Sequence, residues 1–319
     1  MIEQYRHKIR NANILLMVCM VCHYFILLGV YEWIKSTQVP YAVQILMTVL
    51  PTVGGILFPC FIYEVIFARA NKLTLCAVLG KDLATEKPKA VMYFYTVAFA
   101  VLTYAVVCYF NFGLRGIIQY FTEKIALKQI AFTGGAAGII AAIFALAIVP
   151  ALAGEFLNKG IVSSAYRTTG KSLSFLLPVL LSVVFYTDVQ TLLFRLVYGC
   201  AAMIVYKRTN SWLISALFMF VALLPDSISG GGVWLPLDYR STLSTVESLI
   251  NGLFALGVAF IAGTGWVSLL YFAYKKGDAE ISVSKVKPEF TDVISLMLIP
   301  FVYFMLYLLS IFVFLTQSV

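Results

Sequence analysis

The sequence predicts an all-α, polytopic integral membrane protein with about nine transmembrane helices. Of its 319 residues, 61% are apolar and only 12% are charged, and the mean hydropathy is +0.93. Soluble domains are nearer half apolar and about a quarter charged, so the composition excludes a soluble globular protein. A helix that crosses a hydrocarbon core of about 30 Å needs roughly 17 to 25 apolar residues. Runs of that length recur along the whole chain.

Each predicted element is one of these apolar runs, taken in chain order. The six long runs are 12–31, 42–67, 91–110, 130–153, 243–272 and 293–316. A longer apolar block lies between the fourth and fifth runs, and we interpret it as three shorter spans because polar residues interrupt it twice. The three shorter spans are 172–187, 190–206 and 211–224. We expect amino-terminal helices (1–128), a core (129–224), and an external loop with two carboxy-terminal helices (225–319).

No small-residue cleavage site follows the first apolar run, so we expect a retained anchor rather than a signal peptide. Most of the 23 Lys and Arg residues fall in alternate loops, beginning with Arg6, Lys8 and Arg10. Cytoplasmic loops are rich in Lys and Arg, so we expect the amino terminus in the cytoplasm and the carboxyl terminus outside, in a bacterial plasma membrane. Contact with anionic lipid head groups explains the net charge of +8. The expected partner is therefore the lipid bilayer, and no nucleic acid is implied.

The cysteines are expected to be small apolar fillers, because they fall in spans or in cytoplasmic loops where disulfides are rare. They are Cys19, Cys22, Cys60, Cys76, Cys108 and Cys200. The run "CMVCH" at 19–23 places two cysteines and His23 on one helix face. A metal site needs further ligands, and no second cluster of such residues follows. We expect neither a metal nor an organic cofactor.

The segment 148–224 holds the residues that bear on function. An apolar helix ends at Glu155, with Lys159 four residues later and Gly160 directly after it. A helix that contains Gly199 follows, and then the turn "YKRTNSW" at 206–212 and a last apolar helix.

In the order and spacing of these parts, the segment resembles the CAAX protease and bacteriocin-processing (CPBP) family of intramembrane glutamic proteases. The resemblance covers about a quarter of the chain. It implies a conical four-helix core around a cavity lined by Glu155, the stretch 182–188, Met219 and Leu223. In that family one glutamate is thought to activate water, while histidine and asparagine side chains hold the developing oxyanion.

The chain departs from the family at the catalytic positions. Gly154 stands where the first of two paired glutamates is expected, and Lys159 replaces an arginine. Met219 and Leu223 replace a histidine and an asparagine, and the stretch 182–188 contains no histidine. Each lost oxyanion donor typically costs about a hundredfold or more in rate. We therefore expect an inactive homologue that binds or stabilises a membrane partner or peptide.

Two other functions are compatible with the sequence. One is an active CPBP-type intramembrane peptidase that uses Glu155 with substituted partners. The other is a transporter or channel subunit, which the number of apolar spans alone allows.

Ionisable residues within apolar segments are candidates for function because they are costly there. The spacing of Glu155 and Lys159 predicts an i,i+4 ion pair on a helix surface. Asp188 and Arg195 lie two helical turns apart and form a possible polar pair. Glu64 falls close to the cytoplasmic end of its span, where we expect its carboxylate to reach the membrane interface.

Overall fold

The computed structural model describes residues 7–36, 40–73, 90–122, 135–167, 169, 172–183, 189–228, 245–275 and 289–317. Within these residues the chain forms helices and the turns between them, with no strand. The α-helices are α1 (Ile9–Ser36), α2 (Tyr41–Met47), α3 (Val49–Thr52), α4 (Phe58–Ala70), α6 (Ala90–Thr122), α7 (Gly135–Ala142), α8 (Val149–Glu155), α9 (Ser164–Tyr166), α10 (Leu173–Ser182), α11 (Val189–Thr209), α12 (Trp212–Ile228), α13 (Thr245–Lys275) and α14 (Phe290–Gln317). Three π-helical segments lie between them, η2 (Val53–Leu57), η3 (Ile143–Ile148) and η4 (Phe156–Ser163).

Six helical runs in the described part of the chain are long and apolar enough to cross a bilayer. They are Ile9–Ile34, Ala42–Ala70, Ala90–Phe110, Gly135–Tyr166, Leu249–Leu269 and Phe290–Leu309. These runs overlap the six long apolar segments, which confirms the prediction of an all-α membrane protein. The three shorter predicted spans overlap α10, α11 and α12. Because α10 as described has 10 residues, or about 15 Å of helix, the count of nine spans stays a prediction.

The helix that carries Glu155 is longer than the sequence predicted. The expected span 130–153 ended just before Glu155, but the run continues through η4 to Tyr166. The predicted end was wrong because it took the charges of Glu155 and Lys159 to mark the edge of the hydrocarbon. Both side chains are instead buried within the protein, so the helix passes through them without a break.

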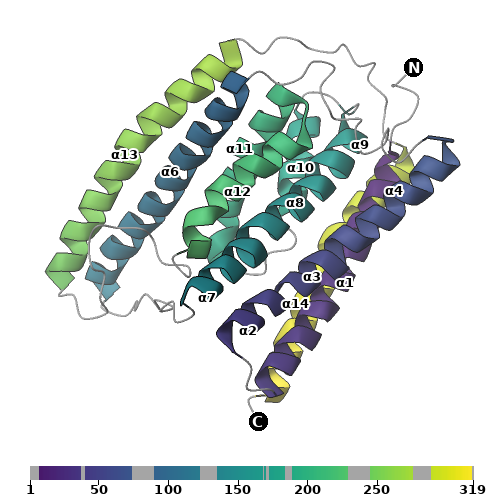
Figure 1. The fold of residues 1–319 in the computed structure, drawn as a ribbon, viewed down its shortest axis with the longest axis horizontal. Coiled ribbons are helices and arrows are strands. Elements are labelled where there is room, and N and C mark those ends of the chain that lie inside the picture. The colour runs from purple at the N-terminus through teal and green to yellow at the C-terminus, as the bar shows by residue number, and fades with distance from the viewer. Residues whose placement is uncertain are drawn as a thin grey trace.

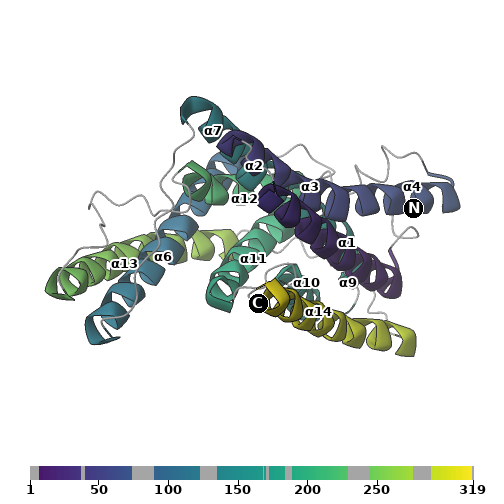
Figure 2. The same cartoon turned by 90° about the horizontal axis from the view of Figure 1, so that it is seen from below.

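The helices lie in three groups side by side (Figure 1). At one flank α6 runs alongside α13, and at the other flank α1 packs against α4 and α14. Between the flanks lie α7, α8, α10, α11 and α12. The pairing of α6 with α13 and of α1 with α14 is also plain in the perpendicular view of Figure 2. Helices from the predicted segments 1–128 and 225–319 therefore pair with each other on both sides of the segment 129–224.

A buried hydrogen-bond network joins the first, middle and last helices. The Asn13 side-chain amide donates to the Ser295 hydroxyl at 3.0 Å, and the Asn13 side-chain oxygen accepts from the Tyr166 hydroxyl at 2.8 Å. Near the start of α14, the Asp292 carboxylate accepts the backbone N–H of Arg10 at 3.0 Å. These bonds hold the start of α1, the end of α9 and the start of α14 at one end of the molecule.

Several basic residues lie at this same end. Arg167, directly after α9, donates to the side chain of Asn210 between α11 and α12 at 3.4 Å. The Arg208 guanidinium lies 5.9 Å from the centre of the Tyr95 ring near the start of α6. The Tyr95 hydroxyl in turn donates to the Leu269 carbonyl of α13 at 3.2 Å. The start of α6 and the end of α13 therefore lie beside each other, and α1 begins at the opposite end of the molecule from the end of α14 (Figure 1).

Candidate functional site

Three adjacent polar side chains are buried at the junction of α8 and η4. Lys159 has 0% of its surface exposed, and Glu155 and Asn158 have 5% each. Lysine and glutamate are almost never fully buried unless they are paired. The surroundings of these three side chains therefore decide what the cluster can do.

The Glu155 carboxylate is held by a serine on another helix. The Ser215 hydroxyl, one turn inside α12, lies 2.5 Å from Glu155 Oε2 and 3.0 Å from the backbone carbonyl of Ala202 in α11. A hydroxyl has a single proton to donate, and 2.5 Å is typical of a hydroxyl that donates to a carboxylate. Ser215 therefore fixes Glu155 and joins α8 to the point where α12 packs on α11.

Lys159 balances the charge of Glu155 without a hydrogen bond. Its Nζ lies 4.0 Å from Glu155 Oε2, beyond the usual range of about 2.7 to 3.2 Å for a hydrogen bond. Among the described residues no other group hydrogen-bonds this nitrogen, nor the side-chain oxygen of Asn158. The i,i+4 ion pair predicted from the sequence is present, but it is buried rather than on a helix surface.

Glu155 also stands between two π-helical segments, η3 and η4. Such segments are rare in proteins and occur frequently at functional sites. Each widens the helix and rotates the following side chains relative to an α-helix. Asn158 and Lys159 lie within η4, and Glu155 directly precedes it. The polar cluster is therefore part of the irregular stretch of the helix.

The other motif positions have apolar or open surroundings. No atom lies within 4 Å of a Cβ built on Gly154, so a larger side chain has room there. Met219 and Leu223 follow Ser215 by one and two turns on the same face of α12. Met219 is half-buried against a cluster of apolar side chains around Phe99, and Leu223 is buried. Ser215 on α12 donates a hydrogen bond to Glu155.

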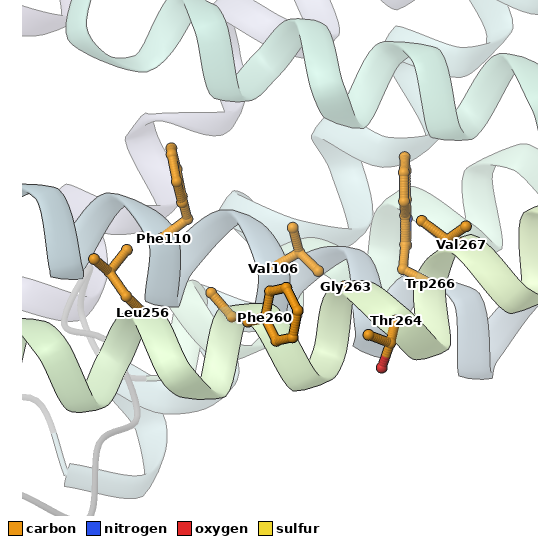
Figure 3. Close-up of a pocket in the computed structure, with 9 residues that line it drawn as sticks. Val106, Phe110, Leu256, Phe260, Gly263, Thr264, Trp266 and Val267 are labelled. Carbon is orange, nitrogen blue, oxygen red and sulfur yellow. The ribbon is translucent and has the colours of Figure 1, made fainter.

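Asp188 and most of the stretch 182–188 lie outside the described residues, so the predicted pair with half-buried Arg195 and the predicted cavity stay predictions. A cavity among the described residues lies in another part of the fold. It lies between α6 and α13 and has a volume of about 670 Å³ (Figure 3).

A second buried carboxylate contact, between His7 and Glu64, was missed by the sequence analysis. His7 Nε2 lies 3.1 Å from Glu64 Oε1, and His7 Nδ1 lies 3.1 Å from the Tyr63 hydroxyl. The His7 ring also packs on Phe67, with 4.3 Å between ring centres. Glu64 is only 3% exposed, so the prediction that its carboxylate reaches the interface was wrong. The reason is that the His7 side chain, just before α1, lies against Tyr63, Glu64 and Phe67 of α4.

The residues of "CMVCH" are bound to different neighbours. His23 Nδ1 hydrogen-bonds to the Pro51 carbonyl at 3.0 Å, and Cys19 Sγ lies 3.9 Å from Cys60 Sγ of α4. A Cβ at Gly55 would lie 2.4 Å from the His23 Cα, so η2 approaches α1 too closely for any larger residue there. Cys19 and His23 therefore take part in the packing of α1 on η2 and α4.

Comparison with known proteins found no family model, no curated protein and no solved structure that matches the chain.

We predict that single changes in the Glu155–Lys159 pair are strongly destabilising. Glu155→Gln and Lys159→Met each leave a buried charge unpaired, which typically costs about 3 to 5 kcal/mol. The double variant removes both charges with little change in side-chain volume and is expected to recover most of that loss. Thermal unfolding in detergent measures all three variants. Single variants that lose only a few tenths of a kcal/mol would show that the pair is exposed to solvent.

We also predict that the contact with His7 stabilises the buried Glu64 side chain. His7→Ala should lower the free energy of unfolding by about 3 to 5 kcal/mol, because the Glu64 carboxylate then stays buried without its partner. Glu64→Gln, as the matched control, keeps the side-chain volume and should cost no more than about 1.5 kcal/mol. Adding Glu64→Gln to His7→Ala should restore stability, which chemical denaturation in detergent can detect. Equal losses for the His7→Ala single variant and the double variant would contradict this assignment.

Proposed function

We propose that this chain is a non-catalytic membrane protein with a CPBP-like helical core, which binds or stabilises a second membrane protein or a membrane-inserted peptide. The observation that carries the proposal is the set of contacts that the Glu155 carboxylate makes within the protein. Its Oε2 accepts a short hydrogen bond from Ser215 and is the atom of Glu155 nearest to Lys159. A general base must instead be within hydrogen-bond reach of the proton that it removes.

The two histidines of the chain add support. His7 is paired with Glu64, and His23 is bonded to the Pro51 carbonyl. Neither of these contacts involves Glu155, Met219 or Leu223. Hydrolysis by a glutamate requires donors that hold the developing oxyanion, and the apolar side chains of Met219 and Leu223 offer none. These features favour binding over cleavage.

The chemistry of the outer helices indicates what kind of partner can bind. The exposed side chains of α14 include Phe290, Met297 and Phe301, with 79%, 70% and 59% of their surfaces accessible. The transfer of such large apolar side chains from water into hydrocarbon is favourable. A protein or peptide that binds here therefore does so within the bilayer.

One set of observations favours the active peptidase as the second candidate. Four polar side chains of different chemistry gather at this point. The Glu155 carboxylate, the Asn158 amide and the Lys159 ammonium group lie within about one helical turn of the same helix. The Ser215 hydroxyl contacts Glu155 directly. The π-helical segments on either side of Glu155 are typical of functional sites. In this alternative, Glu155 would activate water and Ser215 would orient it.

A peptidase assay on the purified protein distinguishes the two candidates. We expect no hydrolysis of membrane-inserted peptides by the unchanged protein, and the same result for Glu155→Gln and Ser215→Ala. In mild detergent, the unchanged protein should co-purify with one membrane protein in a fixed ratio. Robust hydrolysis by the unchanged protein that is lost in Ser215→Ala and in the Glu155→Gln, Lys159→Met double variant, which is expected to stay folded, would overturn the proposal in favour of the peptidase.

We further propose that the end of the molecule that carries Arg10, Arg167 and Arg208 faces the cytoplasm of a bacterial cell. Lys and Arg accumulate on the cytoplasmic side of membrane proteins and are attracted to anionic lipids there. The amino terminus would then be cytoplasmic and the carboxyl terminus external.

Thiol labelling of intact cells tests this orientation. With Cys76 replaced by serine, a cysteine introduced by Ser284→Cys should resist a membrane-impermeant reagent until the cells are opened. A cysteine introduced by Ser229→Cys, in the loop expected on the other side, should react at once. The reverse pattern would show that the protein is inserted the other way round.

A further inference from the structure

The cavity between α6 and α13 has the chemistry of a site for a single hydrocarbon chain. Its volume of about 670 Å³ falls within the range of about 300 to 1,000 Å³ that is usual for small-molecule sites. The lining residues are Val106, Phe110, Leu256, Ala259, Phe260, Gly263, Thr264, Trp266 and Val267. Among these nine side chains, only Thr264 carries a hydroxyl and only Trp266 carries an N–H group. The other seven residues have no polar side-chain atom.

The polar groups at this cavity are already satisfied. The Thr264 hydroxyl donates to the Ile261 carbonyl at 2.7 Å, and Trp266 Nε1 donates to the Thr103 hydroxyl at 2.9 Å. A polar ligand would therefore lose its own hydrogen bonds on entry without gaining new ones, which is costly. A ligand without polar groups meets no such penalty.

The position of the cavity identifies the source of such a ligand. Its walls belong to the apolar runs Ala90–Phe110 and Leu249–Leu269, both of which can cross a membrane. On its rim, Phe260 is 75% exposed and Val267 is 59% exposed. In a bilayer these side chains face lipid tails, so hydrocarbon is the medium that surrounds the opening.

One of the residues that line the cavity is a glycine with open space beside it. In Figure 3, Phe110 and Trp266 stand at opposite ends, with Val106 and Gly263 between them. No atom lies within 4 Å of a Cβ built on Gly263, so the hollow above this residue is free space. The Trp266 ring is held in place by its bond to Thr103 and by stacking on Phe99, with 5.8 Å between ring centres.

We propose that the cavity between α6 and α13 binds one acyl chain of a bilayer phospholipid. A transmembrane helix of a partner is a poorer fit, because helices with their side chains are about 10 Å wide and associate through small residues. Here only Ala259 and Gly263 are small, and bulky side chains stand on the rim. An acyl chain is thin and flexible enough to lie between Phe110 and Trp266. The inference depends on insertion of the chain into a bilayer and not on the proposed loss of catalysis.

Fluorescence quenching of Trp266 by brominated lipid tests this proposal. The other tryptophans are first replaced by Trp33→Phe, Trp212→Phe and Trp234→Phe, and the protein is placed in vesicles of phosphatidylcholine with dibrominated acyl chains. Trp266 should be quenched strongly relative to vesicles of ordinary phosphatidylcholine. Gly263→Leu fills the cavity and should remove at least half of the quenching.

The matched control is Gly257→Leu. Gly257 is also on α13 and also has no atom within 4 Å of a built Cβ, but it does not line the cavity. This variant should be quenched as strongly as the parent protein. If Gly263→Leu does not fold, Val106→Phe narrows the cavity from α6 and should have the same effect. As a measurement independent of quenching, native mass spectrometry should find one retained phospholipid in the parent protein and in Gly257→Leu, but not in the cavity-filling variant.

Three results would overturn the proposal. Equal quenching in Gly263→Leu and Gly257→Leu would mean that Trp266 meets only the general lipid surface. Quenching by brominated stearic acid but not by the brominated phospholipid would assign the site to a free fatty acid. Absence of quenching, together with a cross-link from a photoreactive residue at position 260 to another protein, would assign it to a partner helix.

Discussion

The burial of opposite charges at Glu155 and Lys159 is the constraint on which the middle of the molecule depends. A carboxylate at this position without a positive charge nearby would be expensive in a protein interior. With the charge balanced at 4.0 Å, the helix continues for 11 residues beyond Glu155 and reaches Tyr166. The Tyr166 hydroxyl then bonds to Asn13, and Asn13 bonds to Ser295. The ion pair thus allows one helix to reach α1 and, through Asn13, to be linked to α14.

The same constraint explains why Ser215 lies where it does. A buried carboxylate needs hydrogen bonds as well as a counter-ion, and Lys159 is too far away to supply one. Ser215 supplies it from α12, and the bond fixes the rotation of α12 about its axis. Met219 and Leu223 then follow on the same face, where the CPBP resemblance expects polar side chains. One serine therefore sets which face of α12 is turned toward the polar cluster, and Met219 and Leu223, which follow Ser215 on that face, are apolar.

The helices could be predicted from the sequence because each long apolar run has one simple explanation. The ends of helices were less predictable, as Glu155 shows, because a charged residue marks a membrane boundary only when it faces water. Contacts between distant residues left no local signal. His7 and Glu64 are 57 positions apart in the sequence, and Ser215 is 60 positions from Glu155. The i,i+4 spacing of Glu155 and Lys159 did predict their pairing, because both residues lie on a single helix.

The network of Asn13, Tyr166 and Ser295 has a consequence for how the protein is made. Asn13 and Ser295 are 282 residues apart, and a ribosome adds about 5 to 20 residues per second. The first helix therefore enters the membrane roughly 15 to 60 s before the last one exists. Through that interval the Asn13 amide lacks its Ser295 partner and must be satisfied by water, lipid head groups or another chain. Until α14 is made, α1 can pack on α3, η2 and α4, but the side of α1 that carries the Asn13 amide has no partner from α14.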